Sequence, residues 1–86
     1  MKDDEIISVL QGESRHRGAT ELGELLSTLL DDRLSQGSLI SYFKRSFPEI
    51  PLRTVTEASA WSRVGGDLSD AEFNAMLKPW LPRAKS

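Results

Sequence analysis

The sequence predicts an all-α protein, a compact orthogonal bundle of five helices, or of six if Ser14–His16 begin an extra turn. Apolar residues recur at the three-and-four spacing of a helix face, and no segment alternates polar and apolar residues between hairpin turns. Glycines and prolines fall between these periodic segments. At 86 residues the chain is expected to form a single domain over residues 1–82, followed by a loose tail at 83–86.

Two helices are predicted in the first half of the chain. The first is capped by Asp3 or Asp4 and ends at Gly12, unless it continues through this glycine. The second begins after Thr20 as N-cap and ends at Gly37 as C-cap. Six leucines line its inner face, namely Leu22, Leu25, Leu26, Leu29, Leu30 and Leu34.

A glycine inside the second helix, Gly23, is also informative. Glycine costs about 1 kcal/mol relative to alanine within a helix. We therefore expect a neighbouring helix to approach closely at this position.

Three helices are predicted in the second half. The third starts at Ser38 as N-cap and must end before Pro48. The fourth starts at Pro51 and continues to about Trp61 or Val64. The last follows a capping box, and its inner face is expected to hold Phe73, Met76, Leu77, Trp80 and Leu81.

Two sequence features mark the start and the end of the fifth helix. Ser69 and Glu72 have the spacing of the capping box at its start. Pro79 removes a backbone hydrogen bond, so the helix either kinks or ends there.

The composition argues against several classes of function. Eleven basic and thirteen acidic side chains give a net charge of -2, so nucleic acid is a disfavoured partner. One histidine and no cysteine leave no visible catalytic or metal constellation, and we expect a protein that is not an enzyme and needs no cofactor. The lack of cysteine and of a long apolar run predicts a cytoplasmic protein without a membrane segment.

The stretch GESRHRG, Gly12–Gly18, holds the single histidine between two arginines. His16 has no orienting partner nearby, so the stretch is interpreted as a charged connector rather than an active site. Arg15 and Arg17 either pair with acidic neighbours or reach the acidic face of a second protein.

Charge is segregated along the chain, with an acidic second helix and a basic third and fourth helix. Opposed charged faces suit contact between like or related domains, so we predict a protein–protein interaction module whose partner is a similar or different protein. Trp80, between two prolines, is the expected aromatic anchor. The candidate interaction surface comprises Arg15, Arg17, Glu21, Glu24, Asp31, Asp32, Lys44, Arg45, Arg53 and Trp80.

Two alternatives remain open at this point. Lys44, Arg45 and Arg53 bracket the connector FPEIP, and two short helices around a tight turn could form a helix-turn-helix that binds DNA. A small immunity or antidote protein that masks a toxin would have a similar composition.

The stretches LISYFKRSFPEIPLRTVTEASAW and LSDAEFNAMLKPWL resemble the small all-helical adaptor modules of bacterial conflict systems, the effector-associated and death-fold-like domains. The shared features are a basic-aromatic helix, a proline connector, a helix ending in tryptophan and a capped last helix. This resemblance implies a module that associates with similar domains, brings an effector to its sensor and has no catalytic residues.

Overall fold

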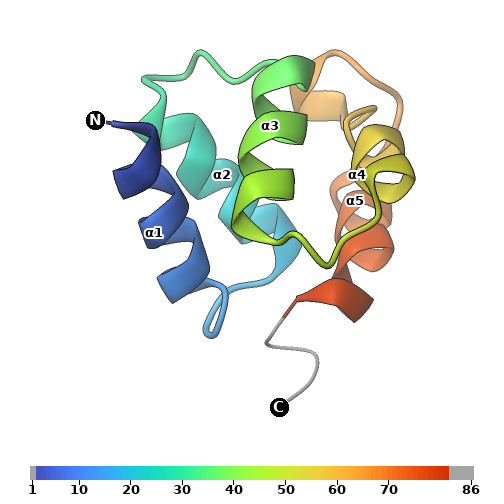
Figure 1. The fold of residues 1–86 in the computed structure, drawn as a ribbon. Helices are drawn as coiled ribbons and strands as arrows, with labels where there is room; N and C mark the ends of the chain where they lie inside the picture. The colour runs from blue at the N-terminus through green and yellow to red at the C-terminus, as the bar shows by residue number, and fades with distance from the viewer. Residues whose placement is uncertain (1, 82–86) are drawn as a thin grey trace.

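The computed structural model describes residues 2–81 of the chain. These residues form five α-helices and two one-turn 3-10 helices, without a strand (Figure 1). The prediction of an all-α bundle is confirmed, whereas the predicted loose tail at 83–86 lies outside the described residues. The elements are α1 (Asp3–Glu13), α2 (Ala19–Leu29), α3 (Gln36–Ser46), α4 (Leu52–Ala58), η1 (Ser62–Val64), α5 (Asp70–Leu77) and η2 (Lys78–Trp80).

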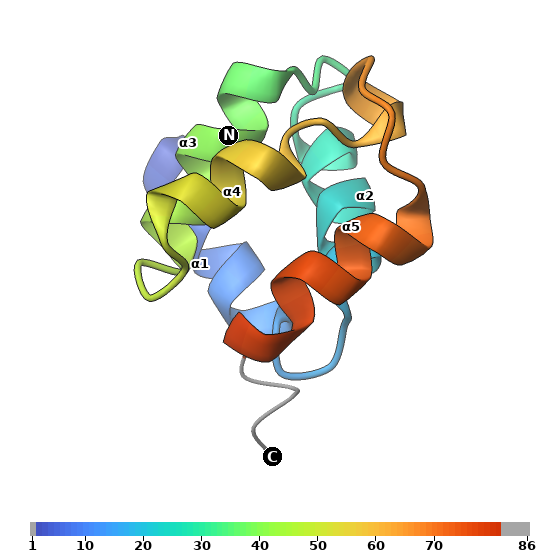
Figure 2. The same ribbon diagram turned by 90° about the vertical axis from the view of Figure 1, so that its right-hand side faces the viewer.

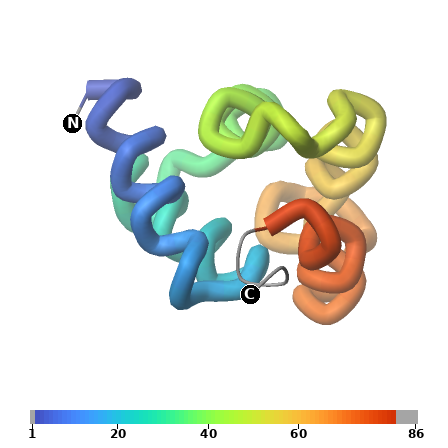
Figure 3. Tube along the Cα trace, turned by 60° about the horizontal axis from the view of Figure 1, so that its bottom comes forward, coloured from blue at the N-terminus to red at the C-terminus, as the bar shows by residue number. Residues whose placement is uncertain are grey.

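The helices enclose one core. Helix α1 packs against α2 and α3, α2 packs against α5, and α4 packs against both α3 and α5. Figure 2 shows α4 and α5 together on one side of the molecule, and Figure 3 shows α1 and α2 on the side opposite to them. The largest buried side chains come from every α-helix and from two connectors, and include Ile6, Leu10, Leu22, Leu26, Leu39, Phe43, Ile50, Val55, Trp61, Phe73 and Leu77.

Helix α1 does not stop at Gly12, so that predicted end is wrong and the alternative of a helix through the glycine is confirmed. The helix continues to Glu13, and the Ser14 amide still donates to the Leu10 carbonyl at 3.0 Å. Residues 14–16 form a turn rather than a sixth α-helix. Gly12 is tolerated because it is exposed near the helix end.

The predicted boundaries of the second helix are also wrong at both ends. Gly18 is the N-cap of α2, and Thr20 lies in the first turn. The helix ends at Leu29, well before Gly37, which belongs to the first turn of α3. The N-cap of α3 is Ser35 rather than Ser38.

The early end of α2 is a Schellman motif without glycine. The Asp31 amide donates to the Thr28 carbonyl at 3.1 Å and the Asp32 amide to the Ser27 carbonyl at 2.8 Å. Asp31 and Asp32 have φ angles of 55° and 62°, the left-handed region that favours glycine. The capping function expected of a glycine is therefore performed by two aspartates.

Helix α4 is shorter than predicted, because the chain leaves it after Ala58 to bury Trp61. The Leu68 amide donates to the Ala60 carbonyl at 2.9 Å, and the Ser62 amide donates to the Leu68 carbonyl at 2.8 Å. These two bonds hold the backbone extended at Trp61, whose side chain is fully buried. Residues 62–64 then form η1 instead of continuing α4.

The indole of Trp61 explains the glycine in α2. A Cβ atom at Gly23 would lie 2.5 Å from Cζ3 and 2.7 Å from Cη2 of Trp61. The close approach predicted at Gly23 is therefore confirmed, but a side chain that follows α4 makes it, rather than a helix backbone.

The start of α5 is as predicted. The Ser69 hydroxyl accepts from the Glu72 amide, and the Glu72 carboxylate accepts from the Ser69 amide, both at 3.2 Å. Of the two outcomes expected at Pro79, the α-helix ends: it stops at Leu77, and the proline lies in η2.

Candidate functional site

Trp80 is exposed because α5 changes to a 3-10 helix before reaching it. A continuous α-helix would place residue 80 on the same face as Phe73 and Leu77, but the tighter winding of η2 turns it outward. Its exposed fraction is 36%, whereas Leu81 is buried instead. The expectation that Trp80 packs on the inner face is therefore wrong, and the alternative of a partly exposed tryptophan is correct.

One other large hydrophobic residue is exposed. Leu52, the first residue of α4, is 58% exposed and is the other exposed large hydrophobic residue of the described chain. We call the exposed residues of η2, Lys78, Pro79 and Trp80, the Trp80 surface.

Among the sequence-predicted basic residues, Lys44 has a structural role. Its Nζ donates to the carbonyls of Pro48 and Ile50 at 2.9 and 2.7 Å. These two contacts hold the connector against the last turn of α3. The ammonium is thereby directed at backbone carbonyls of its own chain.

Arg45, in the same last turn of α3 as Lys44, is engaged by the first turn of α1. Its guanidinium lies 3.3 Å from the Asp3 carboxylate, which also accepts from the Tyr42 hydroxyl at 2.6 Å. The hydrogen bond from Tyr42, followed by that from Arg45, lowers the pKa of Asp3, and the same carboxylate raises the pKa of Tyr42. The cluster joins α1 to α3.

Of the three remaining predicted basic residues, two form ion pairs with carboxylates four positions away in the sequence, and one has no side-chain partner among the described residues. Arg53 lies 3.2 Å from Glu57, one turn further along α4. Arg17 lies 2.8 Å from Glu13, and its hydrogen bond lowers the pKa of that carboxyl. Arg15 is exposed and has no side-chain partner within residues 2–81.

Two of the predicted acidic residues belong to local structure. The Glu21 carboxylate accepts from the Gly18 amide at 3.5 Å, at the start of α2. Glu24 lies 3.2 Å from Arg63, which also contacts Asp70 at 2.8 Å and lies over the Trp61 ring at 5.3 Å. Arg63 thereby holds η1 against α2 and α5.

Asp70 completes this network. It accepts from the Arg63 guanidinium and from Trp61 Nε1, each at 2.8 Å. The hydrogen bond from Arg63, and then that from Trp61, lowers the pKa of Asp70. The carboxylate is therefore a structural anchor for the indole.

Asp31 and Asp32 differ from the other predicted acidic residues. Both are exposed, and neither side chain has a partner among the described residues. A hollow of about 330 Å³ adjoins Asp31 but not Asp32, and it is lined by Ile6, Leu29, Leu30, Asp31, Arg33, Ser38 and Tyr42. We call Leu29, Leu30, Asp31 and Asp32 the Asp31 turn.

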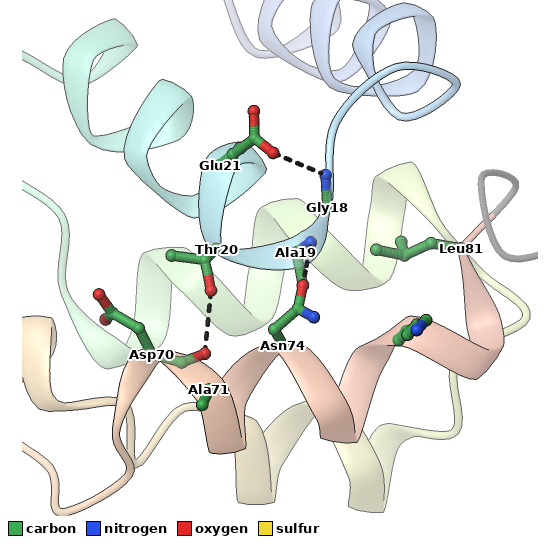
Figure 4. A pocket seen from close by; sticks show the side chains of 9 residues that line it. Gly18, Ala19, Thr20, Glu21, Asp70, Ala71, Asn74 and Leu81 are labelled. Carbon is green, nitrogen blue, oxygen red and sulfur yellow. Dashed lines mark hydrogen bonds between the residues drawn. The ribbon is translucent and has the colours of Figure 1, made fainter.

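The largest hollow described lies elsewhere, between the start of α2 and α5, and measures about 520 Å³ (Figure 4). Its polar groups bond to one another. The Ala19 amide donates to Asn74 Oδ1, and the Thr20 hydroxyl donates to the Asp70 carbonyl, each at 3.0 Å. Two donors at the start of α2 that an anion would use are thus satisfied within the chain.

No family model, curated protein or solved structure matches this chain. Over residues 2–81, no group of three or more His, Cys, Asp or Glu side chains is arranged to hold a metal ion. No helix in this part of the chain has both the length and the apolar character needed to cross a bilayer.

The structure thus separates the predicted surface residues into two groups. Arg17, Glu21, Glu24, Lys44, Arg45 and Arg53 bond within the chain, whereas Arg15, Asp31, Asp32 and Trp80 are exposed to solvent. The surface predicted from the sequence did not include Leu52. Its exposure could have been inferred from its place after Pro51, because the first turn of a short helix is only partly covered by its neighbours.

Proposed function

We propose that the chain is a non-enzymatic protein–protein interaction module that recruits a protein partner through the Trp80 surface. The observation that carries this proposal is the exposure of Trp80, which η2 turns away from the core. Single exposed apolar residues are ordinary. Here the exposed residue is a tryptophan, next to the exposed Lys78 and Pro79 of the same turn.

The chemistry of this surface suits a protein partner. Tryptophan is the residue type most often found among those that dominate the energy of interfaces, because it buries a large area with few rotatable bonds. Proline loses little conformational freedom on binding, so the flanking residues add contact area at low entropic cost. The resemblance to adaptor modules of bacterial conflict systems supports the same role, which would be exercised in the cytoplasm.

DNA binding is supported less well. Lys44 is directed at two backbone carbonyls, Arg45 at Asp3 and Arg53 at Glu57, so all three cations proposed for phosphate contacts are engaged within the chain. The immunity-protein alternative is a form of the same proposal, since it differs only in the identity of the partner.

The test is affinity purification from the native cell with three tagged proteins: wild type, Trp80→Ala and Thr56→Ala. Thr56 is exposed on α4 and its side chain forms no hydrogen bond among the described residues, so it serves as the matched control. We expect a defined protein to be retained by wild type and Thr56→Ala and to be lost with Trp80→Ala. A partner that all three proteins retain equally would contradict the proposed surface.

Titration against duplex DNA at low and moderate salt tests the alternative that the chain binds nucleic acid. Salt-sensitive binding that disappears when Lys44, Arg45 and Arg53 are neutralised would overturn the proposal in favour of a nucleic-acid-binding regulator.

A further inference from the structure

We infer that the hollow between the start of α2 and α5 holds a carboxylate side chain of the partner, so that the Trp80 surface recognises an acidic segment of a protein. This inference rests on the proposed function and gives the partner its chemistry. The observation that carries it is a cation and an amide donor, both unused by the described chain, that line this hollow together.

The hollow and the Trp80 surface are continuous through Lys78. This residue lines the hollow and is also the first residue of η2. Residues three positions apart lie on the same face of a 3-10 helix, and Leu81, three positions after Lys78, lines the hollow as well. Trp80 lies between these two residues in the chain and is exposed. A partner segment that covers Trp80 is therefore adjacent to the hollow.

The free donors of the hollow lie on one face of α5. Asn74 and Lys78 are four positions apart, and the Lys78 amide donates to the Asn74 carbonyl, so the helical spacing that places both side chains on the same face is kept. Asn74 Oδ1 accepts from the Ala19 amide at 3.0 Å, which fixes the orientation of the side chain and turns Nδ2 away from Ala19 (Figure 4). Neither Nδ2 nor the Lys78 ammonium has a hydrogen-bond partner within residues 2–81.

Two carboxylates also line the hollow, and both are engaged by other parts of the chain. Asp70 accepts from the Arg63 guanidinium and from Trp61 Nε1, each at 2.8 Å. Its charge is therefore balanced on the side of η1.

Glu21 is the second of these carboxylates. It accepts from the Gly18 amide at 3.5 Å, and Figure 4 shows it turned toward Gly18 and away from α5. Arg17, whose pKa is raised first by its hydrogen bond to Glu13, has it raised further by the charge of Glu21. Among the described groups that line the hollow, Lys78 is thus the ionised one that lacks a counter-charge.

A carboxylate is the group that these donors match. It has a single charge and two oxygens, so one oxygen can accept from the Lys78 ammonium and the other from Asn74 Nδ2. A phosphate carries more charge and is typically bound by clusters of cations, whereas this hollow offers one. Its volume of about 520 Å³ leaves room for apolar neighbours of the carboxylate to contact the apolar lining, which comprises Ala19, Ala71 and Leu81.

The experiment is a titration followed in two-dimensional proton–nitrogen NMR spectra, in which the side-chain amide of Asn74 and the indole N–H of Trp80 report binding directly. The probe is the peptide Gly-Leu-Glu-Leu-Gly, acetylated and amidated so that its one carboxylate belongs to glutamate. A twin peptide carries glutamine instead. The indole N–H of Trp61, which is fully buried, is the internal reference.

We expect the glutamate peptide, added up to about 10 mM, to shift the Asn74 and Trp80 signals in a saturable way. The glutamine peptide should bind at least about fivefold more weakly, because it forms no charge-assisted hydrogen bond.

Two variants each remove one donor. Asn74→Asp keeps an oxygen for the Ala19 amide and replaces the free donor with a second oxygen, and Lys78→Gln removes the cation. Each should weaken binding of the glutamate peptide at least about fivefold, as read from the Trp80 signal. Arg15→Gln is the matched control, because it removes an exposed cation that has no side-chain partner within residues 2–81 and does not line the hollow. The dispersion of the same spectra shows whether each variant is folded.

Equal binding of the two peptides, or Asn74 and Trp80 signals that stay unchanged up to about 10 mM, overturns the inference. A loss with Arg15→Gln as large as that with Lys78→Gln also overturns it, since attraction to the overall charge would then explain the binding. The proposed function is judged separately by affinity purification. If the partner is lost with Trp80→Ala but retained with Asn74→Asp and with Lys78→Gln, the proposed function stands and this inference alone fails.

Discussion

The substitution Gly23→Ala is expected to destabilise the protein although it places a better helix former in α2. The new methyl group would lie 2.5 Å from Trp61 Cζ3, whereas carbon atoms need about 3.5–4.0 Å. The indole has no room to move away. Its ring stacks on Phe73 with centroids 4.1 Å apart, and its Nε1 is bonded to Asp70 at 2.8 Å.

The net effect follows from two opposing contributions. Extra carbon atoms in a packed core cost about 1–3 kcal/mol, and contacts on both sides of the indole place this site toward the upper figure. Replacing glycine by alanine within a helix returns about 1 kcal/mol. We therefore expect a net loss of about 2 kcal/mol, which corresponds to a fall in Tm of roughly 8–16 °C for a domain of this size.

Gly12→Ala is the matched control, since Gly12 lies in α1 and a Cβ atom there would meet nothing within 4 Å. It should raise the free energy of unfolding by about 0.5–1 kcal/mol. Urea unfolding followed by far-ultraviolet circular dichroism measures both variants, with an unchanged m-value showing that only the stability has changed. If Gly23→Ala proved as stable as Gly12→Ala, the packing argument would be refuted.

Three further predictions concern other contacts. Asp31→Gly should raise the free energy of unfolding by about 1 kcal/mol in the same urea assay, because glycine adopts φ near 55° without strain; no gain would mean that the aspartate side chain itself stabilises the turn. Lys44→Met should cost about 1–3 kcal/mol by breaking both bonds to the connector, and faster hydrogen exchange at the Ile50 amide would locate the loss there. The pKa of Asp70 is lower in the folded protein than in the unfolded chain, where it is near 4, so the carboxylate stabilises the fold above that pH and loses this contribution to the free energy of unfolding as the pH falls through the folded pKa. Asp70→Asn should therefore flatten the decline of Tm below about pH 4. An unchanged decline would contradict this assignment.

The parts of the fold that could be predicted from the sequence are those decided by neighbouring residues. The capping box of Ser69 and Glu72 and the helix end before Pro48 depend on groups only a few positions apart. The end of α2 could not be predicted, because a Schellman motif is normally signalled by glycine and this one uses Asp31. Leu34 lies beyond the end of α2 but still packs against the core, so in the sequence it extends the apolar spacing of a helix past the residue where the helix stops.

Among the candidate site residues, too, only features set by neighbouring positions in the sequence could be predicted. Trp80 could be singled out because prolines flank it. The engagement of Arg45 could not, because its partner Asp3 is 42 positions away and is brought to it only by the packing of α1 on α3. The role of Lys44 depends on the path of the connector, which places two carbonyls within its reach.

The contrasting surroundings of the two tryptophans give the protein its own optical probe. Trp61 is fully shielded from solvent by the core, whereas Trp80 is 36% exposed. A water-soluble collisional quencher such as iodide should therefore dim the fluorescence of Trp80 and leave that of Trp61 nearly unchanged. Any molecule that covers the Trp80 surface would protect the quenchable fraction of the emission, so binding there can be followed in solution without a label.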